Sequence, residues 1–142
     1  MKLSNAHIAM LIETIEGIKD KCMPIAVGVI ISANYEVLTT YTRIYTQARE
    51  VIATKHASID ESGEIVKTVD DEGKELIKIG DMEQFQKEMK ELNEVVFDVA
   101  VTKIPSCEIE KFGEGKYDAL TLKEIDGIKL LIEEEEQDDD TK

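Results

Sequence analysis

Between residues 24 and 56, apolar side chains recur every seven positions in three adjacent registers. The registers are Val27, Asn34, Tyr41 and Ala48; Ile30, Val37, Ile44 and Val51; and Ile31, Leu38, Tyr45 and Ile52. Together they predict one broad apolar stripe on a long α-helix that packs in a bundle. Four threonines between residues 39 and 46 are weak helix formers, which leaves a break near residue 40 as the alternative to a continuous helix.

A shorter amphipathic helix is predicted just before it, over residues 5–21. Ser4 or Asn5 can cap this helix, and its apolar side chains fall on one face: Ile8, Leu11, Ile12, Ile15 and Ile18. Pro24 suits the first turn of the following helix. Two helices joined by so short a connection form an antiparallel hairpin.

The second helix is too long for the first to cover. Read to residue 55 it is about 50 Å long, and the first helix covers about half of that length. A third helix, a second copy of the chain or a foreign partner must therefore cover the rest. The residues predicted to form a protein interface are Asn34, Leu38, Tyr41, Tyr45, Ala48 and Ile52. For Asn34 two interpretations stay open: a polar residue that fixes the register of a helical assembly, or an edge residue facing water.

The remaining segments predict a smaller β component and two more helices. A β-hairpin is expected over residues 58–80, with strands 65–69 and 76–79. A helix opens at Asp81 with a capping-box pattern, a strand covers 94–104, a loop covers 106–119, and a helix capped by Thr121 and Glu124 runs to residue 135. The fold class is thus α+β: a long antiparallel helical hairpin with two further helices and a small antiparallel sheet. We expect one domain over 1–132 and a disordered acidic tail over 133–142.

The charge is −14 and lies almost entirely in the second part of the chain. Residues 1–59 carry six basic and five acidic side chains, whereas residues 60–142 carry 11 lysines and 26 acids. No basic stripe is present to bind phosphates, so direct binding to nucleic acid or to an anionic membrane is not expected. Cys22 and Cys107 have no paired spacing and predict reduced thiols in a cytoplasmic protein.

No motif in the sequence predicts catalysis, and we expect neither an enzyme, a metal site nor a cofactor. His7 and His56 are isolated, and neither cysteine has a partner at the spacing that zinc sites use. Residues 113–116 resemble a phosphate-binding loop only superficially, because Tyr117 stands where a Ser or Thr is needed. Cys107 lacks a basic neighbour closer than Lys103 and Lys111.

The acidic surface has two interpretations. It can serve solubility alone. It can also imitate nucleic-acid phosphates and so block a DNA- or RNA-binding protein, although the densest acidic run is terminal.

Four stretches carry a resemblance to known proteins: residues 1–5, 23–28, 85–92 leading into 95–104, and 120–125 with the closing acidic run. In these stretches, and over most of its length, the chain resembles a family of short proteins of unknown function encoded by tailed bacteriophages and prophages of Gram-positive bacteria. Departures are expected at 58–80 and 112–117. The family supplies no catalytic residues.

The resemblance implies a phage-encoded accessory or virion-associated protein that acts by binding, located in the cytoplasm of a bacterial host or on the virion. We expect a non-enzymatic protein-binding or assembly protein that self-associates through a helical interface. The alternative is an inhibitor of a host defence enzyme or a nucleic-acid-binding enzyme that uses the acidic surface.

Overall fold

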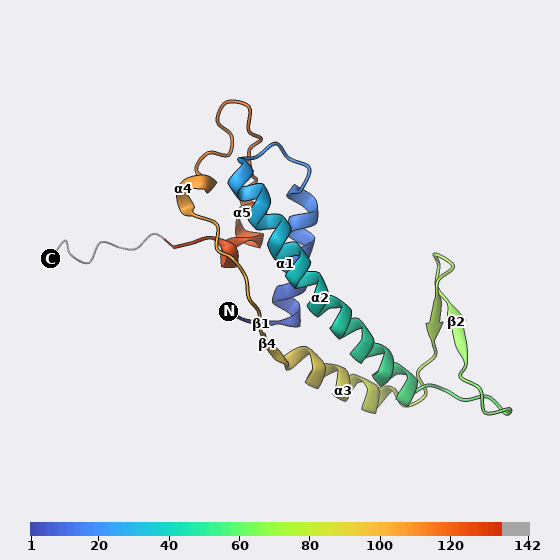
Figure 1. Ribbon diagram of the computed structural model, residues 1–142. Coiled ribbons are helices and arrows are strands. Elements are labelled where there is room, and N and C mark those ends of the chain that lie inside the picture. The colour runs from blue at the N-terminus through green and yellow to red at the C-terminus, as the bar shows by residue number, and fades with distance from the viewer. Residues whose placement is uncertain (135–142) are drawn as a thin grey trace.

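A computed structural model of the chain describes residues 1–134 and confirms the α+β class (Figure 1). The acidic segment predicted to be disordered lies outside the described residues, apart from Glu133 and Glu134. The helices are α1 Asn5–Ile18, α2 Ile25–Lys55, α3 Met82–Glu94, α4 Ser106–Ile109, α5 Leu122–Gly127 and the 3₁₀ turn η1 Lys129–Leu131. The strands are β1 Lys2–Ser4, β2 Lys67–Val69, β3 Glu75–Ile77 and β4 Val96–Asp98.

Helices α1 and α2 form the predicted hairpin, and the C-terminal part of α2 extends well past the N-terminus of α1 (Figure 1). Ser4 caps α1 by accepting a hydrogen bond from the His7 amide at 3.3 Å. Helix α2 is continuous through residue 40, so the break considered as an alternative is not found. Thr39 and Thr40 donate their hydroxyl protons to the Glu36 carbonyl at 3.0 and 3.1 Å, which satisfies these side chains within the helix.

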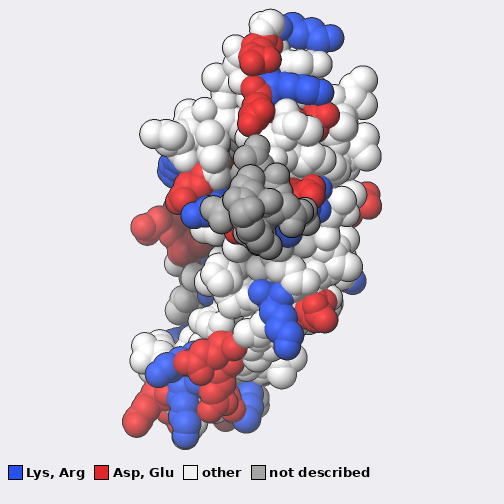
Figure 2. Space-filling model, turned by 90° about the vertical axis from the view of Figure 1, so that its left-hand side faces the viewer, with Lys and Arg blue, Asp and Glu red and all other residues white. Residues whose placement is uncertain are grey.

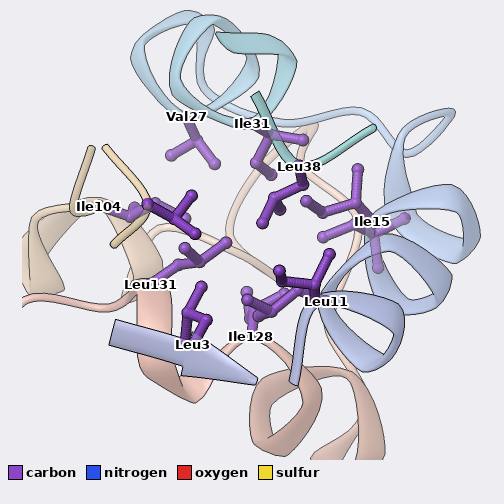
Figure 3. Packing of buried hydrophobic residues seen from close by; sticks show 12 residues of the cluster. Leu3, Leu11, Ile15, Val27, Ile31, Leu38, Ile104, Ile128 and Leu131 are labelled. Carbon is purple, nitrogen blue, oxygen red and sulfur yellow. The ribbon is translucent and has the colours of Figure 1, made fainter. Parts of the chain in front are cut away.

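The core lies between α1, the first half of α2 and the C-terminal segments (Figure 3). Helix α1 contributes Ile8, Leu11, Ile15 and Ile18, and α2 contributes Val27, Ile31 and Leu38. The other buried apolar residues come from β1, from the chain after β4, and from the end of the described segment: Leu3, Val99, Ile104, Ile128 and Leu131. Both ends of the described chain therefore close the core around the helical hairpin.

Within residues 1–134, two antiparallel pairs of strands form the β component. The pair β2–β3 is the predicted hairpin, with Thr68 opposite Leu76 and Gly73 at φ 82° in its turn. Strand β4 pairs with β1, which the sequence analysis did not predict, with Leu3 opposite Phe97. The predicted strand over 94–104 is therefore too long. Its partner β1 has only three residues before α1 begins, so the ladder ends at Asp98.

The C-terminal helix is also shorter than predicted, although the capping box of Thr121 and Glu124 is confirmed. Helix α5 ends at Gly127, and the chain then turns through η1 so that Ile132 lies beside Ile104 in a parallel bridge. The amide of Ile104 donates to the Leu131 carbonyl at 2.7 Å. These contacts with residue 104 replace the further helical turns that the apolar pattern predicted. The segment predicted as a loop contains the single-turn helix α4.

Among the described residues, none of the helices combines the length and the apolar character needed to cross a membrane.

Candidate protein interface on the second helix

The structure places two of the six predicted interface residues inside the core. Asn34 and Leu38 are 1% and 0% exposed. The Asn34 amide nitrogen donates to the Thr102 carbonyl, and the Asn34 oxygen accepts from the Thr102 amide, both at 2.8 Å. Asn34 thus does not face water, and its side-chain amide pairs with the main chain of the segment after β4. This corrects the assignment of Asn34 and Leu38, because the chain's own residues cover them.

Tyr41 and Tyr45 are half-buried beneath β4 and the end of α3. The Tyr41 ring lies 5.1 Å from that of Phe97, and its hydroxyl donates to the Asp98 carbonyl at 3.3 Å. The Tyr45 hydroxyl donates to the Asn93 side chain at 2.8 Å. Of the three proposed covers for this part of α2, the third helix is therefore the one found in the structure. An interface at Tyr41, Tyr45, Ala48 or Ile52 stays a prediction, and all four are half-buried.

An ion-pair cluster fastens α3 to the end of α2. The carboxylate of Glu88 on α3 accepts from Lys55 Nζ at 2.7 Å and from His56 Nε2. The bond from Lys55, followed by that from His56, holds the pKa of Glu88 below its ordinary value. His56 is thus explained by a structural contact between α2 and α3.

A different side of α2 carries the exposed apolar residues. We call it the outer face and define it by Ile25, Val29, Ala33, Thr40, Ile44 and Val51. Ile25, Val29 and Val51 expose 86%, 63% and 68% of their surface, and Ile44 exposes 42%. At 100° per residue these positions fall within an arc of about 100°. The same arc also holds the exposed polar residues Glu36, Gln47 and Thr54, so the outer face is a surface of mixed character that carries the exposed aliphatic side chains of α2.

The prediction that Ile44 and Val51 face inward is wrong, because the seven-residue repeat does not match the period of a straight α-helix. Seven residues at 100° each fall about 20° short of two full turns. On a straight helix each register therefore rotates away from its starting direction. The second register shows this rotation, since Ile30 and Val37 are half-buried and Ile44 and Val51 are exposed.

Several described residues bear on metal binding and catalysis. They contain no group of three or more His, Cys, Asp or Glu side chains able to hold a metal ion. Cys22 and Cys107 are both exposed and are not joined in a disulfide. In the loop that resembles a phosphate-binding loop, the Gly113 amide donates to the Asp118 carbonyl at 3.0 Å, so the loop uses this donor to close its own turn.

A cavity of about 480 Å³ opens between α1 and α5. It is lined by Met10, Glu13, Thr14, Gly17, Thr121, Lys123, Glu124, Asp126 and Gly127. This lining contains carboxylates and one lysine but no thiol or imidazole, so it does not supply a nucleophile with a neighbouring histidine base.

Comparisons of the chain with protein families, with curated proteins and with solved structures found no match.

Proposed function

We propose that this chain is a non-enzymatic protein-binding protein that acts through the outer face of α2. The observation that carries the proposal is the row of exposed aliphatic side chains along that face, above all Val29, Ile44 and Val51. Single exposed apolar residues are ordinary, but a row along one rigid helix offers a partner an apolar strip, here interrupted by Glu36, Thr40 and Gln47. The opposite side of α2 is held by α1, β4 and α3, so the strip is presented on a fixed scaffold.

The resemblance to phage proteins suggests the biological context in which this binding takes place. We propose an accessory or assembly-associated protein of a tailed phage, made in the cytoplasm of its bacterial host and either retained there or built into the virion. The partner is a protein rather than nucleic acid, because the chain carries a charge of −14.

The alternative, an inhibitor that imitates nucleic acid, rests on the 26 acids of residues 60–142. On the face shown in Figure 2, however, acidic and basic side chains stand next to one another, including at the level of α3. Mimicry requires an array of acids on a rigid element. The mixed charge on this face favours the outer face of α2 as the binding surface, and the inhibitor remains the second proposal.

The proposed function is tested with an outer-face variant, Val29→Glu/Val51→Glu, and a matched control, Val69→Glu/Leu122→Glu. All four side chains are exposed, but the control residues lie away from α2: Val69 is on β2 and Leu122 is on α5. Chemical cross-linking followed by mass spectrometry is carried out on purified protein and in host-cell extract. We expect the outer-face variant to lose cross-linked protein partners that the wild type and the control retain. Identical cross-links in all three proteins would refute the proposal.

A further inference from the structure

We propose that the partner of the outer face is a second copy of this chain, bound with its α2 antiparallel and with the two-fold axis passing Thr40. This inference rests on the proposed function and adds the identity, direction and register of the partner. It follows from three features of α2: the spacing of its exposed valines, the order of its charges, and the hollows at its two ends.

Two residues of the outer face, Val29 and Val51, are placed symmetrically about Thr40. Val29 and Val51 each lie eleven residues from Thr40, on opposite sides. At 1.5 Å per residue that is about 16 Å along the helix in each direction. In an antiparallel pair, Val29 of each chain therefore lies level with Val51 of the other. Ile44 likewise lies within about 1.5 Å of the level of the second copy's Val37.

The charged side chains beside the outer face are ordered so that opposite charges meet when a second α2 runs in the opposite direction. Glu36, Arg43 and Glu50 follow one another at seven-residue intervals, with Glu36 inside one side of the face, Arg43 at its boundary and Glu50 just beyond it, and all three are exposed. Around Thr40, Arg43 of one chain lies within about 1.5 Å of the level of Glu36 of the other. The symmetry makes this contact twice, and each contact joins opposite charges.

The same order decides against a parallel pair. A two-fold axis perpendicular to the helices brings equivalent edges together, so the charged edge meets the charged edge. An axis along the helices brings opposite edges together instead. Arg43 would then face the apolar edge formed by Val37 and Ile44, and Glu36 would also lack a charged neighbour. The antiparallel arrangement is the one in which both charges are paired.

Hollows at the two ends of α2 also face each other in the antiparallel pair. The first is lined by Lys19, Met23, Ile25, Gly28, Val29, Ile31 and Ser32, and the second by Gln47, Glu50, Val51 and Thr54. Lys19 lines the first hollow and Glu50 the second, so a further pair of opposite charges faces across the interface.

The charge order is tested by substitution, using sedimentation velocity and light scattering from about 1 to 300 µM, the range in which modest interfaces form. We expect the wild type to dimerise, Arg43→Glu to weaken the dimer about tenfold, and Glu36→Arg/Arg43→Glu to restore it. The matched control is Arg49→Glu, an exposed position on another side of α2. Circular dichroism establishes that each variant is folded. A monomeric wild type, or equal weakening by Arg43→Glu and Arg49→Glu, would overturn the inference.

The direction is tested by disulfide formation in a Cys22→Ser/Cys107→Ser background. We expect a mixture of Val29→Cys and Val51→Cys chains to form the mixed disulfide in preference to either symmetric one. Predominant linkage between two Val29→Cys chains would overturn the antiparallel arrangement. A monomeric wild type whose outer-face variant still loses cross-links to other proteins would refute the second copy while supporting the proposed function. Unchanged cross-links in that variant would refute the proposed function itself.

Discussion

The side chain of Asn34 and the main chain of Thr102 exchange two hydrogen bonds of 2.8 Å, one in each direction. An amide side chain thereby takes the place of a neighbouring strand for this residue of the segment after β4. Asn34 is 1% exposed, so the pairing also satisfies a polar group within the core. The contact fixes where the chain crosses α2 on its way from β4 to the buried Ile104.

The first prediction concerns this exchange. We expect Asn34→Ala to lower the free energy of unfolding by about 1–3 kcal/mol, because the two Thr102 main-chain groups lose their partners. Asn34→Asp keeps only the acceptor and places a carboxylate against the Thr102 carbonyl, so it should cost at least as much at neutral pH. The matched control is Thr102→Ala, since the exchange uses the main chain of Thr102. Chemical denaturation measures all three, and equal stability of Asn34→Ala and Thr102→Ala would contradict the prediction.

The parts of the fold that depend on neighbouring residues could be predicted from the sequence. The helical hairpin, the β2–β3 hairpin and the caps at Asp81 and Thr121 follow from apolar spacing, turn residues and capping side chains. The side chain of Asp81 accepts a hydrogen bond from the main-chain amide of Gln84 at 3.2 Å, as its capping pattern indicates.

The missed features join distant parts of the chain. Strand β1 pairs with a segment more than ninety residues away, and three residues give no period-two signal. The end of α5 likewise depends on Ile104 and Ile132. For the candidate interface, the sequence correctly indicated that α2 carries uncovered apolar residues, but the predicted residues lie on the side of α2 that the rest of the chain covers. The rotation of about 20° per heptad explains why Ile44 and Val51 are the exposed residues instead.

The second prediction concerns the close approach of α5 to α1. A Cβ atom on Gly127 would lie 2.2 Å from the Thr14 hydroxyl oxygen, so Gly127→Ala should lower the free energy of unfolding by about 1–3 kcal/mol. Adding Thr14→Ala removes the two nearest atoms and should recover part of the loss. Gly17→Ala is the control, because nothing lies within 4 Å of its added Cβ, and there alanine should stabilise α1. Thermal unfolding of these three variants beside the wild type tests the prediction; similar effects of Gly127→Ala and Gly17→Ala would refute it.

The third prediction uses the lowered pKa of Glu88. Because Lys55 and His56 bind its carboxylate, Glu88 stabilises the fold when ionised. Its pKa is lower in the folded than in the unfolded chain. The stabilisation is therefore complete at neutral pH and is lost as the pH falls below about 4.5 and through the folded-state pKa. Glu88→Gln should be less stable than the wild type at neutral pH, with the difference shrinking in acid.

The control for Glu88 is Glu91→Gln, an exposed position on the same helix. Urea denaturation measured between neutral and acidic pH compares the variants. A stability difference between Glu88→Gln and the wild type that does not change with pH would contradict the assignment.

The fourth prediction separates the two sides of α2. Tyr45 and Ile52 are half-buried on the side that α3 covers, and the Tyr45 hydroxyl binds Asn93. Tyr45→Glu and Ile52→Glu should lower the melting temperature, because each places a charge in this contact. Ile44 and Val51 lie on the exposed outer face. Ile44→Glu and Val51→Glu should therefore leave the melting temperature almost unchanged while weakening the dimer. Calorimetry beside light scattering tests this; a loss of stability in Val51→Glu equal to that in Tyr45→Glu would contradict it.

The last prediction concerns the salt dependence of self-association. Exposed charge pairs are screened over about 8 Å at physiological ionic strength, whereas salt does not weaken the burial of apolar surface. The wild-type dimer should therefore lose at most about tenfold in affinity between about 50 mM and 0.5 M salt. In Arg43→Glu the contact with the second copy's Glu36 becomes repulsive, so salt should strengthen that dimer. Opposite trends in the two proteins, measured by sedimentation, would be the signature of the antiparallel pair, and the same trend in both would contradict it.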